Sequence, residues 1–366
     1  MKRIVLTGGG TAGHVTPNIA LLPSLKEAGY EVFYIGSYDG IEKRLLADFD
    51  VTYYGIATGK FRRYFDLKNF TDPFRVVKGQ AEARKILKEL KPDVVFSKGG
   101  FVSVPVVKAA ASLKIPCIIH ESDMSPGLAN KLCISSAKKI CCNFPETMSK
   151  IPADKAVLTG SPIRVELSKG SKEAGYKLCG FTPDKPVVMV IGGSQGAQSI
   201  NEAVRESLDS LLLDFQVVHI CGKDKMDNLM LSIPGYKQFE YIKSELKDVF
   251  AMADVVISRA GANAICELLA LNKPNILIPL SMGSRGDQIL NASSFEGQGF
   301  SAVIREEDLD PISLVETVHE VYLNRNMYIE NMVGSGQMNS IKSIMGLIEE
   351  CALKPEQDET ESKEKY

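Results

Sequence analysis

The stretch 254–291 contains the unit from which parallel sheets with helical crossovers are built. Residues 254–258 are an apolar, β-branched run, which is typical of a buried parallel strand. The small residues 259–263 then predict a turn, 264–271 a helix and 275–279 the next strand. A helix that begins at the carboxyl end of a strand presents free backbone N–H groups and the positive end of its dipole, which can hold an anion. The stretch therefore predicts part of a parallel α/β sheet, either with an anion site at its edge or as an ordinary βαβ unit.

Polar side chains accompany this turn. Glu267 is expected one turn into the helix, where its carboxylate cannot bind phosphate but can accept hydrogen bonds from the paired hydroxyls of a sugar. Asp287 and Gln288 follow the next strand and add polar groups at the same edge. The edge thus combines a candidate anion site with acceptors for hydroxyl groups.

The same order of strand, glycine turn and helix occurs elsewhere in the chain. Residues 2–7 predict a strand, 8–13 a glycine loop and 17–28 a helix. In the second half, a strand at 187–191 leads into a second glycine loop at 192–197, and a helix is expected to follow as far as Leu213. The chain has 366 residues, which is too long for one typical domain, so two α/β halves are expected.

Further polar loops follow the strands expected at 94–97 and 115–120. In an open parallel sheet such carboxyl-end loops line one crevice. The turn-rich segment 160–164 is interpreted as the connection between the halves, and Arg164 within it is either a phosphate ligand or a surface cation. Ser194 and the glycine amides around it form a second candidate anion site.

The first glycine loop, 8–13, leaves two interpretations open. It is compatible with a dinucleotide site, but the strand expected at 31–35 ends in Gly36 rather than in the usual acidic residue, and Asp39 lies only in the loop beyond. His14 stands at the start of the helix, whose positive end disfavours an imidazolium, so it should stay neutral, as a general base must. The alternative is a histidine that only hydrogen-bonds to the loop.

The segment 60–78 interleaves aromatic and aliphatic side chains with cations. This pattern suits an anionic membrane surface. The alternative is a helix pair that packs its aromatic side chains inward and leaves the cations in solvent. The expected membrane patch consists of Phe61, Arg62, Arg63, Phe65 and Phe70.

Composition and charge exclude several classes of protein. A net charge of −2 provides no basic field for nucleic acid, and no apolar run approaches the roughly 20 residues of a spanning helix. The N-terminus lacks the apolar segment of a signal peptide, which predicts a cytosolic chain. Eight cysteines without CxxC or Cys/His ligand spacing predict buried, reduced thiols. The charged segment 354–366 is expected to be a disordered tail.

Seven motifs resemble those of the MurG family of glycosyltransferases. They span nearly the whole chain in the order and spacing of that family: GGGTAGHVTP (8–17), SKGGFVSVP (97–105), HESDMSPGLANK (120–131), GSPIR (160–164), GGSQGAQSIN (192–201), SRAGANAICE (258–267) and DQILNA (287–292). Each motif alone is a weak signal, whereas the set is highly specific. The segment 120–131 is typical of the Gram-positive branch.

The resemblance implies the GT-B architecture, in which two doubly wound Rossmann-like α/β domains face each other across a cleft. It implies inverting transfer of N-acetylglucosamine from UDP-N-acetylglucosamine to the C4 hydroxyl of undecaprenyl-diphospho-N-acetylmuramoyl-pentapeptide, the step from lipid I to lipid II in peptidoglycan synthesis. The implied location is the cytoplasmic face of the cell membrane, as a peripheral protein, with other cell-wall synthesis proteins as partners.

The expected division is a membrane-associating acceptor domain at 1–161 and a donor domain at 162–338. A helix at 339–353 should pack back on the first domain, ahead of the tail at 354–366.

Residue roles carry over where the motifs match. The resemblance assigns the UDP-N-acetylglucosamine site to Thr11, Ala12, Gly13, Arg164, Ser194, Ile242, Ala262, Asn263, Ala264, Ile265, Cys266, Glu267 and Gln288, with Asp123 and Gln195 as further candidates. Within this set, Arg164 and Ser194 would bind the diphosphate, and Ile242 would present its backbone to the uracil. Glu267 would accept the ribose hydroxyls, and Gln288 would contact the sugar.

The resemblance also makes His14 the candidate base on the acceptor hydroxyl, with Glu121 or Asp123 as alternatives. Two positions depart from the family pattern. Ala12 stands where many members have glycine, and Asp123 stands where many have an asparagine that contacts the donor sugar.

Inverting transfer needs a base, an in-line anomeric carbon and a stabilised UDP leaving group. Many glycosyltransferases use a metal ion for the last task, but we find no Asp-x-Asp motif suited to one. Helix N-termini, Ser194 and Arg164 can supply the positive field, so we predict catalysis without metal or cofactor. Three alternatives remain: another GT-B enzyme such as a lipid glucosyltransferase or an epimerase, a nicotinamide-dependent oxidoreductase, and a non-catalytic nucleotide-sugar sensor.

Overall fold

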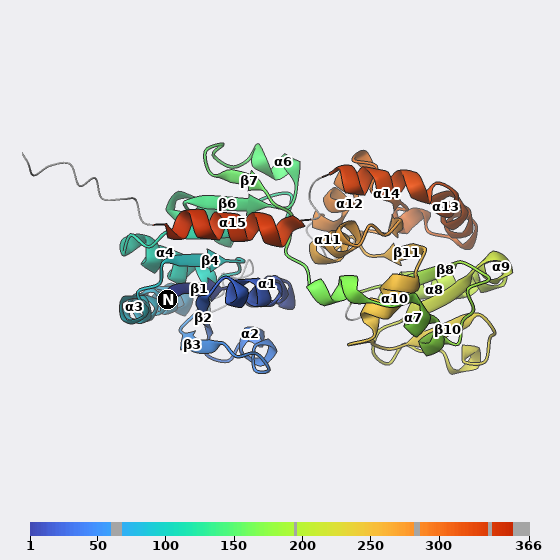
Figure 1. Cartoon of the computed structure of the whole chain (residues 1–366), viewed down its shortest axis with the longest axis horizontal. Coiled ribbons are helices and arrows are strands. Elements are labelled where there is room, and N and C mark those ends of the chain that lie inside the picture. The colour runs from blue at the N-terminus through green and yellow to red at the C-terminus, as the bar shows by residue number, and fades with distance from the viewer. Residues whose placement is uncertain (60–67, 194–195, 282–285, 336–338, 354–366) are drawn as a thin grey trace, which may run out of the picture.

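The computed structural model of the chain describes residues 1–59, 68–193, 196–281, 286–335 and 339–353; side chains are described from residue 75 onward within the helix that begins at Lys68. The described residues form two parallel β-sheets, each covered by helices (Figure 1). The tail expected at 354–366 lies outside these residues.

The first half builds a seven-stranded sheet among the described residues, in the order β3-β2-β1-β4-β5-β6-β7. Its strands are β1 (Lys2–Thr7), β2 (Tyr30–Ser37), β3 (Thr52–Ile56), β4 (Val94–Ser97), β5 (Cys117–Glu121), β6 (Lys139–Cys142) and β7 (Ala156–Leu158). Its helices are α1 (Thr16–Glu27), α2 (Ile41–Leu45), α3 (Lys68–Leu90), α4 (Ser103–Ser112), α5 (Leu128–Cys133) and α6 (Pro145–Met148).

The second half builds a six-stranded sheet from its described residues, in the order β10-β9-β8-β11-β12-β13. Its strands are β8 (Val187–Ile191), β9 (Gln216–Ile220), β10 (Tyr236–Phe239), β11 (Val255–Ser258), β12 (Asn275–Leu277) and β13 (Ala302–Val303). Its helices are α7 (Lys172–Cys179), α8 (Gln198–Glu206), α9 (Leu208–Asp214), α10 (Leu246–Met252), α11 (Ala262–Ala270), α12 (Asp287–Gly297), α13 (Pro311–Leu323) and α14 (Arg325–Gly334).

In both sheets the strand order reverses beside the first strand of the half. The reversal lies between β1 and β4 in one sheet and between β8 and β11 in the other. Ligands of open parallel sheets bind outside the carboxyl ends of the strands at such a point, because the two flanking loops diverge there. The fold therefore directs attention to the loops that follow these four strands.

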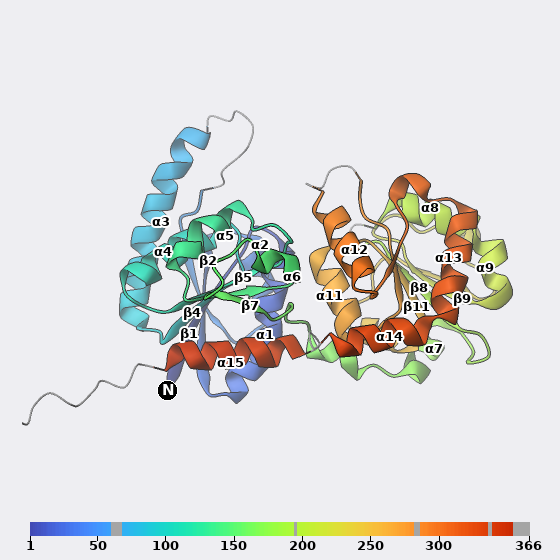
Figure 2. The same cartoon turned by 90° about the horizontal axis from the view of Figure 1, so that it is seen from above.

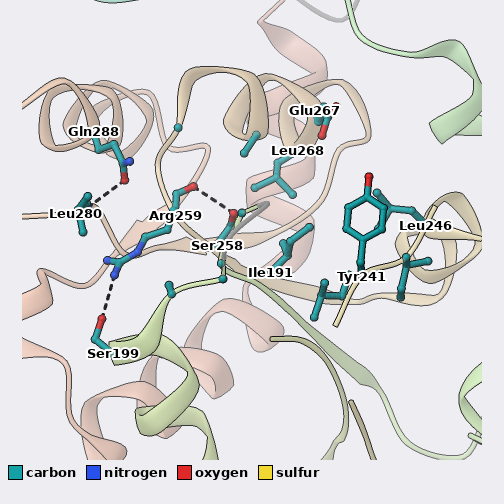
Figure 3. A pocket seen from close by; sticks show the side chains of 18 of the residues that line it. Ile191, Ser199, Tyr241, Leu246, Ser258, Arg259, Glu267, Leu268, Leu280 and Gln288 are labelled. Carbon is teal, nitrogen blue, oxygen red and sulfur yellow. Dashed lines mark hydrogen bonds between the residues drawn. The ribbon is translucent and has the colours of Figure 1, made fainter. Parts of the chain in front are cut away.

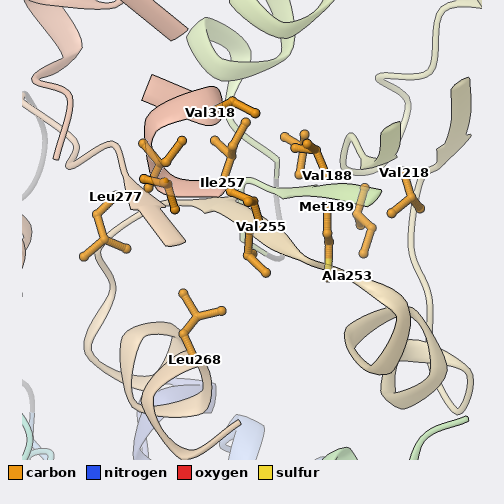
Figure 4. Close-up of a cluster of buried hydrophobic side chains, with 14 of the residues drawn as sticks. Val188, Met189, Val218, Ala253, Val255, Ile257, Leu268, Leu277 and Val318 are labelled. Atoms are coloured by element: carbon orange, nitrogen blue, oxygen red, sulfur yellow. The ribbon is translucent and has the colours of Figure 1, made fainter. Parts of the chain in front are cut away.

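The sheets are held by apolar side chains that the sequence pattern predicts. The strands β8 and β11 contribute fully buried residues such as Val188, Met189, Val255 and Ile257, and Leu268 of α11 packs toward them (Figure 4). Parallel strands covered on both faces need such continuous apolar runs. The eight cysteines are buried and free, as expected.

A last helix, α15 (Ser340–Ala352), crosses from the second half to the first. It lies beside α1, β4 and β5 (Figures 1 and 2). Ile344 and Ile348 are fully buried in the core that includes Ile4 and Leu6 of β1. The Ser340 hydroxyl donates a 2.8 Å hydrogen bond to the carbonyl oxygen of Ser161. The helix thus completes one face of the N-terminal sheet.

The predicted two-sheet α/β architecture is confirmed, but several element boundaries were wrong. The expected helix after 197 is interrupted at Ser207, whose hydroxyl bonds back to the carbonyl of Ala203 at 2.6 Å and so competes with the regular ladder. The strand expected at 237–242 ends at Phe239, which leaves Ile242 in a loop. The strand β3 and the helix α14 were not predicted, because their apolar spacing is weak.

No helix among the described residues is long and apolar enough to cross a membrane.

Candidate active site

The helix α11 begins at a loop that follows the reversal point of the second sheet. Gly261 caps it in an extended conformation, and no side chain of the described residues accepts a hydrogen bond from the first turn. The first N–H groups of the helix, at residues 262–264, are therefore free to bind an anion, and the helix dipole adds positive charge there. The helix begins two residues earlier than predicted, so Glu267 lies in its second turn.

A cavity of about 980 Å³, called here the C-terminal pocket, opens beside this helix. Arg164, Ile242, Glu267 and Gln288 all line it; Glu267 and Gln288 are labelled in Figure 3. Four residues predicted from distant parts of the sequence thus meet in one cavity, which is large enough for a nucleotide-sized ligand.

Arg164 and Glu267 form an ion pair across the C-terminal pocket. One guanidinium nitrogen of Arg164 lies 3.4 Å from Oε1 of Glu267. Burial raises the pKa of the Glu267 carboxyl, and Arg164 acts in the opposite direction. The Nε atom of Arg164 is buried without a hydrogen-bond partner among the described residues, so the guanidinium keeps a donor for an anionic ligand.

One end of the C-terminal pocket is apolar and the other is polar. Tyr241, Leu246 and Ile242 line the apolar end, and Tyr241 and Leu246 are drawn side by side in Figure 3. No hydrogen bond from the described part of the chain reaches the backbone of Ile242. This end offers a flat aromatic surface together with free backbone groups, which suits a nucleobase.

The polar end carries a network around Arg259. Its guanidinium donates to the hydroxyl of Ser199 at 3.0 Å and to Glu306. Although burial raises the pKa of Glu306, hydrogen bonds from Ser199, Ser281 and Arg259 together hold it at about 2. Gln288 accepts a 3.0 Å hydrogen bond from the N–H of Leu280, which leaves its amide NH₂ as a donor. The sequence did not mark Arg259, since a cation in a turn carries no distinguishing pattern.

A second cavity of about 360 Å³, called here the interdomain pocket, lies between the two halves. Thr11, Gly13 and His14 line it from the first half, together with Asp123, and Asn263 lines it from the second. The amide nitrogen of Asn263 is 3.4 Å from the carbonyl oxygen of Gly13. The loop after β1 and the start of α11 therefore face each other directly.

His14 has a defined tautomer in this pocket. Its Nδ1 atom lies 3.0 Å from the carbonyl oxygen of Gly9, and since a carbonyl only accepts, Nδ1 carries the proton. The Nε2 atom is then the basic nitrogen. Burial, followed by the nearby charge of Lys98, lowers the pKa of His14. The side chain is thus neutral near pH 7, as its predicted role as a base requires.

Glu121 is less suited to act as the base. It is buried, and its two oxygens accept hydrogen bonds from the N–H groups of Asp123 and Gly127 and from the side chain of Asn130. A carboxylate with these partners shapes the loop after β5. Asp123 itself lines the interdomain pocket and remains a candidate contact for the ligand.

The comparisons with known proteins agree on one family. The model of the glycosyltransferase family 28 N-terminal domain matches residues 4–142, and that of the family 28 C-terminal domain matches residues 187–348. A relative from Lachnospira eligens, named UDP-N-acetylglucosamine--N-acetylmuramyl-(pentapeptide) pyrophosphoryl-undecaprenol N-acetylglucosamine transferase, is 64% identical over 351 residues, covering 96% of this chain and 99% of the relative. A relative of the same name from Lachnoclostridium phytofermentans is 62% identical and covers 97% and 100%. The chain belongs to the MurG family.

Solved structures support the same assignment. The crystal structure of Acinetobacter baumannii MurG matches with a TM-score of 0.76 and 27% identity, covering 96% of this chain and 100% of that one. A UDP-GlcNAc 2-epimerase from Neisseria meningitidis matches with a TM-score of 0.69 at 14% identity, which shows a shared fold alone. The GT-B architecture expected from the resemblance to the MurG family is confirmed.

The structure divides the residues assigned by the MurG resemblance into several groups. Thr11, Gly13, Asp123, Ala262 and Asn263 line the interdomain pocket, whereas Ala264 lines both cavities. Ala12 lies on the same loop in the short helix η1 (Ala12–His14) but does not line either cavity.

The assignment of Ile265 and Cys266 needs correction at the level of the side chain. Both are buried, Ile265 completely and in the core of the second half. Ile265 packs into that core, whereas Cys266 lies near Lys98, whose pKa it raises; neither residue lines either of the two cavities.

Several of the residues predicted from the sequence lie outside the part of the chain that the structure describes. Ser194 and Gln195 lie outside the described residues, as do Phe61, Arg62, Arg63 and Phe65. Phe70 belongs to α3, but its side chain is not described.

No cluster of three His, Cys, Asp or Glu side chains suited to a metal ion occurs in the part of the chain that the structure describes. The two Asp-x-Asp strings, at 48–50 and 308–310, do not line either cavity, and Asp310 instead caps α13 through the N–H groups of Ile312 and Ser313.

The dinucleotide interpretation of loop 8–13 meets a physical obstacle. The carboxylate of Glu42, which is fully buried, accepts a hydrogen bond from the N–H of Gly10 at 3.3 Å. A pyrophosphate at this loop would lose that amide and meet a negative charge. The loop is therefore better suited to carry His14 than to hold a dinucleotide.

Proposed function

We propose that this protein transfers N-acetylglucosamine from UDP-N-acetylglucosamine to the muramyl-(pentapeptide) pyrophosphoryl-undecaprenol acceptor, and so converts lipid I to lipid II in peptidoglycan synthesis. The observation that carries the proposal is the 64% identity to a transferase of that name along 99% of its length. The protein is a hexosyltransferase, and its two cavities are consistent with neighbouring sites for a donor and an acceptor.

The C-terminal pocket is the proposed donor site. The diphosphate of the donor would lie at the free N–H groups of α11, with the unpartnered Nε of Arg164 as a further donor. Glu267 would exchange its ion pair with Arg164 for the ribose hydroxyls. The uracil would lie between Tyr241 and the backbone of Ile242.

This arrangement would stabilise the leaving group. As the glycosidic bond breaks, negative charge grows on the β-phosphate, and preorganised N–H donors at a helix N-terminus stabilise such charge without rearrangement. The donor sugar would then point from the start of α11 toward the interdomain pocket, with Gln288 of the C-terminal pocket and Asp123 of the interdomain pocket as the proposed contacts for its hydroxyls.

The interdomain pocket is the proposed site of the chemical step. His14 would take the proton from the acceptor hydroxyl through Nε2. Its Nδ1 would keep its own proton and donate it in a hydrogen bond to the carbonyl oxygen of Gly9. The hydroxyl oxygen would attack the anomeric carbon from the face opposite UDP, which inverts that centre. His14 lies in the first half and α11 in the second, which supports a base and a leaving group on opposite sides of the bond.

This geometry supports separate roles for the two halves of the chain. We assign acceptor binding and membrane contact to residues 1–161 and donor binding to 162–338. The membrane patch at Phe61, Arg62, Arg63, Phe65 and Phe70 belongs to this proposal, because a lipid-linked acceptor must be reached at the bilayer. Peripheral association at the cytoplasmic face of the membrane, and contacts with other cell-wall synthesis proteins, extend the same proposal.

The anomeric configuration of the product tests the proposal. UDP-N-acetylglucosamine and a lipid I analogue should give UDP and a β-linked disaccharide lipid, identified by NMR of the anomeric proton, with UDP-glucose a poor donor. An α-linked product, or preference for UDP-glucose, would contradict it, and free N-acetylmannosamine would indicate the epimerase alternative.

A further inference from the structure

The interdomain pocket contains a cation that the proposed reaction does not use. Lys98 follows β4, lines the pocket and has only 1% of its surface exposed. Burial lowers the pKa of its ammonium to about 8, partly offset by neighbouring acidic groups. Burying a lysine ammonium destabilises the folded protein unless hydrogen-bond or charged partners compensate for the lost solvation, so a buried lysine calls for an explanation.

Two side chains from the neighbouring strand and its loop fix the position of this ammonium. The Nζ atom lies 2.8 Å from Nδ1 of His120 and also donates to the hydroxyl of Ser122. The Nε2 atom of His120 lies 2.9 Å from the carbonyl oxygen of Gly160, so Nε2 carries the proton and Nδ1 is the acceptor. His120 is therefore neutral and receives a hydrogen bond from a charged lysine.

Glycine residues bring Lys98 and His14 close together. A Cβ atom added at Gly8 would lie 3.3 Å from the Cβ of Lys98 and 2.5 Å from the backbone oxygen of His14. A Cβ atom at Gly100, whose φ is +81°, would lie 3.1 Å from Nδ1 of His14. The loop after β1 and the loop after β4 are thus in direct contact, and Lys98 and His14 both line the interdomain pocket, close enough for the charge of Lys98 to lower the pKa of His14.

The other charged groups near this pair are few. Glu42 of α2 lies near His14 and raises the pKa of its imidazole. Lys98 is faced by His120 and Glu121 of β5, by Asp123 of the following loop, by Cys141 of β6 and by Cys266 of α11. Lys98 is the only cation in this set, since His14 and His120 are neutral.

We propose that Lys98 is a positioning residue for the transfer reaction, whose fixed ammonium beside His14 keeps that imidazole uncharged and so keeps Nε2 available for the acceptor hydroxyl. The inference rests on the proposed function for its meaning, because His14 matters only as the base of that reaction. It does not require Lys98 to touch either substrate.

The mechanism is electrostatic. A positive charge in a poorly solvated pocket repels a second one, so protonation of His14 is disfavoured while Lys98 is charged. Below the pKa of the ammonium, at about 8, this repulsion is present. Removal of the charge should therefore raise the pKa of His14.

The direct test is an imidazole titration followed by ¹⁵N NMR. The chain has four histidines, so the His14 signal can be assigned by comparison with the H14A variant. In K98M, which keeps the length of the side chain without its charge, the pKa of His14 should rise by several tenths of a pH unit or more. In K98R the pKa should stay near the wild-type value. An unchanged pKa in K98M, or an equal rise in K98R, would overturn the proposal.

Lys273 provides a matched control. It is a half-buried lysine of the second half. Desolvation lowers the pKa of its ammonium to about 8, and its Nζ donates a 2.9 Å hydrogen bond to the carbonyl oxygen of Ala253. K273M should leave the His14 titration unchanged; a shift equal to that in K98M would show a general effect of losing a desolvated charge and overturn the proposal.

A second measurement needs no substitution. In the wild-type protein, the ¹⁵N shifts of His14 should show a further small step near pH 8 as Lys98 loses its proton, and a single transition would count against the proposal.

The acid limb of kcat/KM should also move to higher pH in K98M, which a purely structural loss would not cause. Because the titrations need no substrate, they succeed or fail independently of the transfer activity.

Discussion

The side-chain amide of Asn263 lies 3.4 Å from the carbonyl oxygen of Gly13, two positions separated by 250 residues in the sequence. Asn263 belongs to the first turn of α11, whose N–H groups are the proposed phosphate site. Gly13 precedes the candidate base. This contact sets the helix that would stabilise the leaving group against the loop that would activate the acceptor, so the relative position of the two halves is part of the chemistry.

His14 is the first residue to change. H14A should lower kcat by about 10²–10⁴-fold, because the acceptor hydroxyl would lose its base, whereas the affinity for UDP should stay close to wild type. Steady-state transfer rates and calorimetric UDP titration measure the two effects. H319A is the control, since His319 lies on α13 away from both cavities. A near-normal kcat in H14A would move the role of base to Asp123 or another group.

The pH profile gives an independent check on the same residue. A base acts only when it is deprotonated, and burial together with Lys98 lowers the pKa of His14. The activity should therefore persist below pH 6.5, the ordinary histidine value, before kcat/KM falls. An acid limb centred above pH 6.5 would contradict the structure, and an H14A variant that kept the wild-type limb would assign the limb to another group.

Glu267 is predicted to recognise the ribose of the donor. E267Q should weaken UDP binding by about ten- to a hundred-fold, since hydrogen bonds to a charged acceptor contribute more than those to a neutral one. The sharper readout is a comparison of UDP with 2′-deoxy-UDP. Wild type should prefer UDP, and E267Q should lose most of that preference. If E267Q kept the full discrimination, Glu267 would not contact the ribose; E316Q, on α13, is the control.

The segment 60–78 is predicted to face the bilayer. Replacement of Phe61, Phe65 and Phe70 by serine should weaken sedimentation with anionic liposomes while UDP affinity is kept, because apolar area and adjacent cations bind the membrane together. The paired control is L229S/L323S, which removes exposed leucines from the second half. Simultaneous loss of liposome and UDP binding would mean that these phenylalanines belong to the core.

Helix α15 is predicted to stabilise the N-terminal half although it follows the C-terminal half in sequence. Ile348 is fully buried against that sheet, so I348A should lower the free energy of unfolding by about 2–5 kcal/mol. Calorimetry with and without UDP distinguishes the unfolding of the two halves, since UDP should raise only the transition temperature of the donor half. I348A should lower the other transition. A loss confined to the UDP-sensitive transition would contradict the assignment, and I312A, at an exposed isoleucine of α13, is the control.

Local patterns in the sequence predicted the sheets and their loops well. The apolar runs of β1, β8 and β11 and the glycine turns after them are short-range signals, and they placed Glu267 and Gln288 near one edge, whereas the role of Arg164 came from the family resemblance. The burial of Ile265 and Cys266 was not accessible in this way, because packing against neighbouring elements decides which side of α11 is covered.

Lys98 shows a second limit. In the sequence it is a polar residue after a strand, no different from a solvated lysine. Its burial depends on His120 and Ser122, more than twenty positions away, and on the start of α11 from the other half. Such a group becomes visible only once the two sheets are placed together.

The central claim is tested most directly by transfer of label from UDP-[¹⁴C]N-acetylglucosamine to a lipid I analogue in the presence of excess EDTA. Label should appear in the lipid product at the rate seen without EDTA, since helix α11 and Arg164 are proposed to stabilise the diphosphate in place of a metal ion. Loss of transfer in EDTA, restored by a divalent cation, would contradict metal-independent catalysis. The absence of transfer under both conditions, with UDP-N-acetylglucosamine still bound, would contradict the proposed acceptor.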